Sequence, residues 1–353
     1  MLRKFAVLTL LFIAAAGWAI AAGGGTTVKI MTQNMDDGTD QGYIVAASQG
    51  AMSLADAVDL TFSELQASHL EQRDALLAGK IAAQKPDIIA LEEVALWRIG
   101  PTPNTAIVPV YDHLAFLLLE LLKHGAFYDV VAVNTVDDVA LPGNKIGALR
   151  YTDRNVLLAR VDLSPPLLRF SNVQSHIFNA FLPFAGLQIH SGWISADVGV
   201  GAKQFHLVTT HLESTVPGVP EATAVQVAQA EELLTSLHNT TGPVVICGDF
   251  NSDANDNPAS VDFTPSADDI RAAGFTDVWS MTHPGDPGNT WPLYLEDQFP
   301  VAFPPFTPFE RIDLIFSRGM QILSEAQVVA PGAPGFSPPF ASDHAGVIAT
   351  LGM

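Results

Sequence analysis

Six short clusters of polar residues stand out along the sequence, because each contains residue types that bind metal ions or transfer protons. They are Asn34, Glu92-Glu93, His211, Gly248-Asp249-Phe250-Asn251, Arg311-Ile312-Asp313 and Ser342-Asp343-His344. A single aspartate after a strand usually serves a turn or caps a helix. Six clusters of carboxylate, imidazole and amide side chains are hard to explain in that way. We therefore expect them to form one site.

The side chains in these clusters suit the hydrolysis of a phosphate ester. Mg²⁺-type cations take oxygen ligands from one or two carboxylates and leave room for water and a substrate phosphate. Glu93 and one of the aspartates fit that description. The reaction also needs a group that orients or activates water, donors for the charge on the phosphoryl oxygens, and an acid for the leaving oxygen. Side chains of these types are present in Asp249, Asn251, His211 and His344.

The clusters lie at or near the ends of segments that predict strands. Apolar, β-prone runs cover 28–34, 87–91, 128–133, 155–161, 192–200, 204–210, 243–248, 311–317 and 347–351. Helical patterns cover 63–84, 111–124, 220–238 and 268–273. Residues 283–308 are rich in proline and glycine and predict a long ordered loop. This mixture predicts a mixed α/β domain with both sheet faces covered.

In the order and spacing of these clusters, the sequence resembles the endonuclease/exonuclease/phosphatase superfamily, which includes pancreatic-type DNases, apurinic endonucleases, neutral sphingomyelinases and inositol-polyphosphate 5-phosphatases. The matching motifs are Thr32-Gln33-Asn34, Leu91-Glu92-Glu93-Val94, Thr210-His211-Leu212-Glu213-Ser214, Gly248-Asp249-Phe250-Asn251, Arg311-Ile312-Asp313 and Ser342-Asp343-His344. The resemblance implies an α/β fold, a four-layer α/β sandwich with two central mixed β-sheets flanked by helices. It also implies metal-dependent hydrolysis of a phosphodiester by water attack at phosphorus.

The resemblance further implies a metal site. Its ligands would be Asn34, Glu93 and Asp343, and the cation would be Mg²⁺, with Mn²⁺ or Ca²⁺ as alternatives. Glu92 departs from the glutamine common before the metal-binding glutamate, and we interpret it as a neighbour that points the other way along the strand.

The remaining roles implied by the resemblance are catalytic. Asp249 would orient or activate the attacking water, and Asn251 and His211 would contact the phosphate. His344 would lie at the scissile phosphate and be oriented by Asp313. Asp153 has two open interpretations, as a partner of His211 or as an exposed aspartate that opens a strand. The other eight histidines, among them His113 and His190, are expected in core or surface roles.

The pattern of residues 1–21 predicts a secretory signal peptide. Arg3 and Lys4 precede an apolar run from Phe5 to Ile20, and Ala19-Ile20-Ala21 forms a small-residue cleavage pattern. This run is shorter than the roughly 20 residues that span a bilayer, so a membrane anchor is disfavoured. We expect a secreted or periplasmic protein without stable membrane insertion, monomeric, with a single domain over residues 22–353.

Composition narrows the choice of partner. The net charge of −20 disfavours a basic nucleic-acid-binding face, although bound cations can reverse the field locally, so a nuclease is not excluded. Cys247 is the only cysteine, so no intrachain disulfide can form and it is predicted to be a packed thiol.

The substrate stays open at this stage between a nucleic acid and a phospholipid headgroup. Residues 165–192 are unusually apolar, which fits either an extra element packed on the sandwich or a lipid-facing surface. Two further alternatives are a small-molecule phosphomonoesterase and a non-catalytic binding module that retains the fold.

Overall fold

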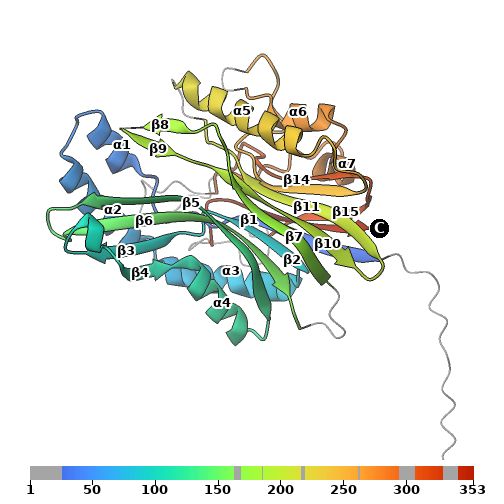
Figure 1. Cartoon of the computed structure of the whole chain (residues 1–353), viewed down its shortest axis with the longest axis horizontal. Coiled ribbons are helices and arrows are strands. Elements are labelled where there is room, and N and C mark those ends of the chain that lie inside the picture. Colours follow the sequence, from blue (N-terminus) through green and yellow to red (C-terminus); the bar gives the residue numbers. More distant parts are fainter. Residues whose placement is uncertain are drawn as a thin grey trace, which may run out of the picture.

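The structure is a computed structural model that describes residues 26–162, 168–184, 186–215, 219–260, 263–293, 307–328 and 341–353. In these residues two β-sheets pack face to face, and helices cover their outer faces (Figure 1). The predicted four-layer α/β sandwich is confirmed. None of the described helices is long and apolar enough to cross a membrane.

The larger sheet has the strand order β15-β16-β1-β2-β6-β3-β4 in the described residues, with β5 also paired to β6. Its strands are β1 (Thr27–Asn34), β2 (Ile88–Glu92), β3 (Leu96–Gly100), β4 (Val108–Asp112), β5 (Tyr128–Pro142), β6 (Ala148–Arg160), β15 (Gln321–Val328) and β16 (Gly346–Gly352). β1 and β2 run parallel and β1 and β16 antiparallel, so the sheet is mixed.

The smaller sheet has the described strand order β13-β14-β12-β11-β10-β7. Its strands are β7 (Leu168–Ile177), β10 (Gly192–Val200), β11 (Lys203–His211), β12 (Val244–Asp249), β13 (Thr276–Asp277) and β14 (Asp313–Arg318). β10 and β11 form the predicted hairpin, and β11 and β12 are parallel. Two short strands, β8 (Leu182–Phe184) and β9 (Leu187–Ile189), pair with each other as a separate ribbon.

Helices close the sandwich on both sides. α3 (Leu70–Gln84) and α4 (His113–Lys123) pack on the larger sheet, and α5 (Pro220–Ser236) and α6 (Ser266–Ala272) pack on the smaller one. The other helical elements are α1 (Gly42–Ser48), α2 (Leu54–Ala67), α7 (Val278–Thr282) and the 3₁₀ turn η1 (Pro103–Thr105).

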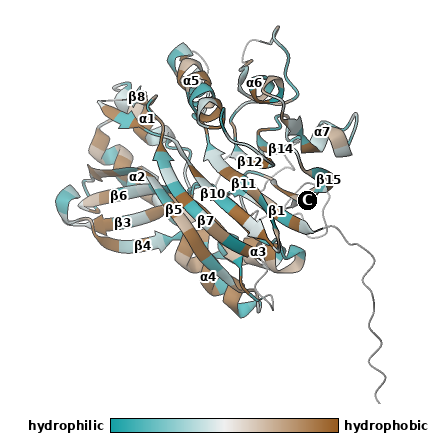
Figure 2. Cartoon of the chain, turned by 45° about the vertical axis from the view of Figure 1, so that its right-hand side comes forward, coloured by the Kyte–Doolittle hydropathy of each residue, from teal (hydrophilic) through white to brown (hydrophobic). Residues whose placement is uncertain are grey.

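The central strands are buried on both faces, and their alternating side chains enter different cores. In β12, Val245 and Cys247 point between the sheets, whereas Val244 and Ile246 pack toward α5 and α6. Cys247 is a buried free thiol, as predicted. Figure 2 shows hydrophilic and apolar residues mixed along the outer strands, where one face meets water.

The predicted helix over 63–84 is wrong in its continuity, because the segment forms two helices. Ser68 ends α2, and His69 adopts a left-handed conformation with φ of 53°, which an α-helix cannot contain. Leu65 and Leu70, on either side of the break, both enter the same small core with Trp97. The turn therefore serves packing that the helical periodicity does not reveal.

Two other predicted boundaries differ from the structure. The helix predicted from 111 begins at His113, because Tyr111 and Asp112 complete β4, and the Asp112 carboxylate accepts the N–H of Ala115 at 3.5 Å. The predicted strands 128–133 and 155–161 are parts of a much longer hairpin formed by β5 and β6. Polar residues such as Asp137 and Asp153 interrupt the hydrophobic pattern in its outer part, so the sequence does not reveal its full length.

Candidate active site

Strand pairing brings the predicted site residues to one end of the sandwich. In the parallel pair β1–β2, Asn34 lies opposite Glu92. In the smaller sheet, His211 lies opposite Asp249, and Asp249 lies opposite Asp313 on the next strand. The strand ends of both sheets therefore deliver these side chains side by side.

The backbone at the site takes conformations that are uncommon for residues with a side chain. Glu93 and Asn251 have φ values of 52° and 47°, in the left-handed region. Gly248, before Asp249, has a φ of 147°, and a Cβ there would lie 1.8 Å from the carbonyl oxygen of Thr210. Only glycine fits this close approach. Such backbone outliers concentrate at functional sites, where the surrounding fold holds them.

Asp249 is the centre of the site. Its Oδ2 accepts a hydrogen bond from the Asn34 amide at 2.9 Å, and the same amide nitrogen donates to Glu93 Oε1 at 2.8 Å. The Nε2 atoms of His211 and His344 lie 3.6 and 3.8 Å from Asp249 Oδ2. Burial raises the pKa of Asp249, and the two histidines partly offset this. Two imidazoles thus approach one oxygen of a buried carboxylate.

His344 and Asp313 form a buried pair. His344 Nδ1 lies 2.9 Å from Asp313 Oδ2, and the backbone N–H of His344 donates to the Ser342 hydroxyl at 3.0 Å. Burial alone would lower the pKa of His344, but Asp313, Asp343 and Asp249 raise it well above its usual range. The imidazole is therefore fixed in orientation and held in its cationic form, with Nε2 toward Asp249.

His211 has a different set of partners. Its Nε2 lies 3.1 Å from the Asn251 amide nitrogen, which also donates to Leu212 O at 2.9 Å. Burial lowers the pKa of His211, but the negative charges of Asp249, Glu93 and Asp153 raise it by more, so the net shift is upward. In the described residues, Asp153 makes no hydrogen bond to His211 and acts on it through charge alone. The predicted phosphate contact of Asn251 remains a prediction.

Asp343 is held by a residue that the motifs do not include. The Trp291 indole N–H donates to Asp343 Oδ2 at 2.8 Å, and Asp343 Oδ1 lies 3.8 Å from His344 Nε2. Burial raises the pKa of Asp343 to about 7, with His344 lowering it and Asp36 and Glu93 raising it. Trp291 lies 52 residues before Asp343, so no local pattern in the sequence connects the two.

The arrangement fits a divalent cation. Ligand atoms of Glu93, His211 and Asp249 all lie within 4.8 Å of one another, and the same holds for Asp249, Asp313 and His344. The second group is already linked by its histidine–aspartate hydrogen bond, so the first is the better candidate for the cation. Two carboxylates provide the oxygen ligands that hard cations prefer.

Asn34 and Asp343 are the other predicted metal ligands. Asn34 Oδ1 accepts the backbone N–H of Asp36 at 2.9 Å, which leaves its amide nitrogen facing the two carboxylates. Asp343 lines the same cavity but belongs to neither compact group. Their roles as ligands remain predictions.

Glu92 and Glu93 separate as interpreted from the sequence. Glu92 is buried, and its Oε1 accepts the hydroxyls of Thr32 at 3.0 Å and Thr209 at 3.2 Å. Burial raises the pKa of Glu92 to about 8, so the carboxyl is largely protonated at neutral pH. Glu93 instead lines the cavity.

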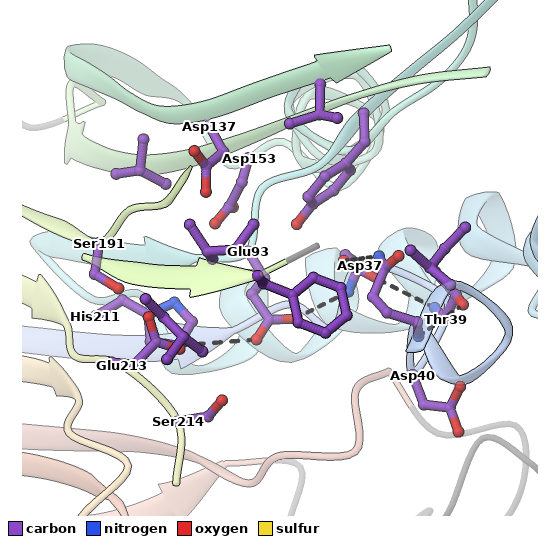
Figure 3. A pocket seen from close by; sticks show the side chains of 18 of the residues that line it. Asp37, Thr39, Asp40, Glu93, Asp137, Asp153, Ser191, His211, Glu213 and Ser214 are labelled. Atoms are coloured by element: carbon purple, nitrogen blue, oxygen red, sulfur yellow. Dashed lines mark hydrogen bonds and ion pairs between the residues drawn. The ribbon is translucent and has the colours of Figure 1, made fainter. Parts of the chain in front are cut away.

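A cavity of about 710 Å³ adjoins these residues. Its lining includes several residues that the sequence analysis missed. Figure 3 shows Asp137 and Asp153 on one side, Glu93 and His211 in the middle, and Asp37, Thr39 and Asp40 at one end. His190, predicted in a core or surface role, lines the cavity and lies 3.0 Å from Asp137. Asp37 could have been suspected, because it follows the strand end at Asn34 by three residues.

Comparison with solved structures supports the fold alone. An endonuclease/exonuclease/phosphatase from Beutenbergia cavernae has a TM-score of 0.56 and 20% identity, over 93% of this chain and 72% of that one. A family protein from Leptotrichia buccalis has a TM-score of 0.56 and 16% identity, over 92% and 100%. D. rerio TDP2, complexed with single-strand DNA product, has a TM-score of 0.52 and 16% identity, over 93% and 100%.

Among curated proteins, none matches this chain in sequence. The sequence profile described as the Endonuclease/Exonuclease/phosphatase family matches residues 62–344, which is most of the chain and includes five of the six clusters. The sixth, Asn34, joins them in space through its hydrogen bonds to Glu93 and Asp249. The chain therefore belongs to the endonuclease/exonuclease/phosphatase family.

Proposed function

We propose that this protein is a divalent-metal-dependent phosphoesterase that hydrolyses a phosphodiester by attack of water at phosphorus. The observation that carries the proposal is that the Nε2 atoms of His211 and His344 both approach the same carboxylate oxygen of Asp249, Oδ2, at 3.6 and 3.8 Å. Hydrolysis of a phosphate ester needs a group that orients or activates the attacking water and groups that stabilise charge or protonate the leaving oxygen. The carboxylate of Asp249 suits the first task, and the two imidazoles suit the second.

Each side chain has a part in this reaction. Asp249, whose pKa is raised by burial, is suited to accept a proton from the attacking water. His344 is cationic and oriented by Asp313, so it can stabilise the charge on the phosphoryl oxygens and donate a proton to the leaving oxygen. A cation held by Glu93 would supply Lewis-acid stabilisation of the phosphate charge.

The direct test uses bis(4-nitrophenyl) phosphate with purified protein. We expect hydrolysis with Mg²⁺, Mn²⁺ or Ca²⁺ that is lost in excess EDTA, and a large loss in Asp249→Asn, which keeps the side-chain shape but removes its basicity. No hydrolysis with any of the three ions would support a binding module instead. Faster hydrolysis of 4-nitrophenyl phosphate than of the diester would indicate a phosphomonoesterase.

We also propose that the chain is exported after removal of residues 1–21, which lie outside the described residues. The proposal is supported by the apolar run from Phe5 to Ile20 and the cleavage pattern Ala19-Ile20-Ala21 at its end. N-terminal sequencing of the protein released from cells should begin near Ala22. Recovery of the intact Met1 end from the membrane fraction would contradict it.

A further inference from the structure

The long hairpin of β5 and β6 carries a polarity gradient along one face of the cavity. Side chains two residues apart on a strand share a face. Three cross-strand pairs on this face line the cavity, and in order away from His211 they are Asp137 with Asp153, Val139 with Tyr151, and Leu141 with Leu149. The wall thus changes from carboxylates beside the site to apolar side chains farther along.

The ribbon of β8 and β9 supplies a second apolar wall. Its register pairs Leu182 with Ile189 and Phe184 with Leu187, and all four side chains line the cavity while only partly buried. Gln188 points to the opposite, exposed face of the ribbon. The ribbon therefore has one apolar face, turned toward the cavity, which no other described element covers completely.

α1 forms a third side of the same cavity. Ile44 and Val45 line it, and none of the residues of this helix is fully buried. Figures 1 and 2 both place α1 beside the β8–β9 ribbon, at the same end of the molecule. Apolar surface that remains in contact with water is a source of binding free energy for an apolar ligand.

Charge argues against a polyanion in this cavity. Nine carboxylates line it, and the described lining residues include no lysine or arginine. A cation at Glu93, beside Asp249, can neutralise one phosphate. Further phosphates along a nucleic-acid strand would face carboxylates such as Asp40 and Asp137, and no lysine or arginine of the described lining would neutralise them. Nucleic-acid binding normally draws on lysine and arginine contacts to several phosphates.

We propose that the substrate is an amphiphilic phosphodiester, with its phosphate at Asp249 and an uncharged apolar ester group in the space between the β8–β9 ribbon, β5–β6 and α1. This inference rests on the proposed function and names its substrate class. A volume of about 710 Å³ suits a single small ligand, since such sites typically measure roughly 300–1,000 Å³.

The test is a series of 4-nitrophenyl phosphodiesters with methyl, butyl and octyl groups, dispersed as monomers and assayed with saturating metal. Because the leaving group is constant, only burial of the alkyl chain changes. We expect kcat/KM to rise by about fourfold for each added methylene that the cavity buries. Equal kcat/KM for the three esters, or more efficient cleavage of single-stranded DNA than of the octyl ester, would overturn the proposal.

Variants of the ribbon locate the effect. Phe184→Ser and Leu187→Ser should each lower the ratio of octyl to methyl kcat/KM by about tenfold, because each removes apolar contact with the chain. Gln188→Ser, on the exposed face of the same ribbon, should keep the wild-type ratio. Phe184→Leu keeps an apolar side chain and should retain most of the wild-type ratio of octyl to methyl kcat/KM. Circular dichroism checks that each variant is folded, and the other variants still test the ribbon if one serine variant is not. An unchanged ratio in a folded serine variant would sink the assignment.

Two further arms separate other outcomes. Release of phosphocholine from phosphatidylcholine vesicles would identify a membrane lipid as the source of the ester, and turnover of the dispersed esters alone would identify a soluble one. Both results support the inference. Absence of hydrolysis of even the methyl diester with every metal would instead refute the proposed phosphodiesterase function itself.

Discussion

Arg311 and Asp313, two residues apart at the start of β14, belong to two buried groups of charged residues that are built in opposite ways. Asp277 accepts hydrogen bonds from Arg311 at 3.0 and 2.7 Å and from Arg271 at 2.7 Å. Burial would raise the pKa of Asp277, but Arg311 and Arg271 lower it to about 2. In the candidate active site, Asp249 and Asp343 face His344 instead of an arginine, and burial leaves their pKa values raised.

This difference separates stability from reactivity. A carboxylate with a lowered pKa stabilises the folded state at neutral pH, whereas one with a raised pKa destabilises it there. The pair of Asp277 and Arg311 therefore supports the fold. The active site instead holds carboxylates poised to take up a proton or a cation, and the rest of the fold offsets their cost.

The largest expected effect is on the rate, in the pair of His344 and Asp313. His344→Ala should lower kcat about 10²–10⁴-fold, the range for groups that transfer protons or stabilise charge. Asp313→Ala should lower it less, and the double variant should be little worse than His344→Ala, because nothing remains to orient. Multiplicative losses, with all three variants folded, would show that the two residues act independently.

The next effect is on stability, at Arg311. Arg311→Met should lower the free energy of unfolding in urea by about 3–5 kcal/mol, because it leaves Asp277 buried without its main cation. Arg150→Met, which breaks the more exposed pair with Asp138, should cost only about 0–1 kcal/mol. Similar losses in both would remove the contrast between the buried group and an ordinary surface pair.

The stabilisation by Asp277 should also depend on pH. Its folded pKa of about 2 lies below the ordinary 3.8, so its contribution is fully present above about pH 4 and is lost as the pH falls toward 2. Urea unfolding between pH 5 and 2.5 should therefore show a steeper loss of stability in the wild type than in Asp277→Asn. Parallel curves would contradict this assignment.

Glu93→Gln should change the metal requirement. An amide in place of the carboxylate removes the charge that attracts a hard cation, so the Mg²⁺ or Mn²⁺ concentration for half-maximal activity should rise by at least about tenfold. Asp129→Asn removes one negative charge from an exposed position on β5 and serves as the control. Equal metal dependence in Glu93→Gln and the wild type would rule out Glu93 as a ligand.

The smallest effect is a gain in stability at Asp153. Burial raises the pKa of Asp153 to about 7, so above that pH the folded state holds a charge that it disfavours. Asp153→Asn should stabilise the metal-free protein by about 1–2 kcal/mol at pH 8, and the gain should shrink as the pH falls from 7 toward 4. A loss of stability at pH 8 would show that the charge on Asp153 is favourable, as a direct partner of His211 would make it.

The sequence predicted those parts of the structure that depend on local patterns. Buried strands are short apolar runs, and a polar residue at their end, such as Asn34 or Asp249, is visible without knowledge of the fold. The order of the clusters then indicated the family and its layers. The orientation of Glu92, which stands where a glutamine is common, could also be predicted. Neighbouring side chains on a strand point to opposite faces, so Glu92 and Glu93 point in different directions.

The rest depends on contacts between distant segments. The hydrogen bond from Trp291 to Asp343 and the break at His69 arise from tertiary packing, which the local sequence does not encode. The cavity wall is another example. The apolar character of residues 165–192 was evident, but only the pairing of Phe184 with Leu187 shows which face the ribbon turns toward the site.

The separate pairing of β8 and β9 has a consequence for how this protein can change over time. Because the ribbon is its own two-stranded sheet, substitutions in it do not alter the register of either central sheet. Natural selection can therefore vary this segment while the catalytic strand ends stay intact. Under the proposed function, substitutions confined to residues 182–189 should therefore change which ester is accepted while the strand ends that carry His211 and Asp249 keep their positions.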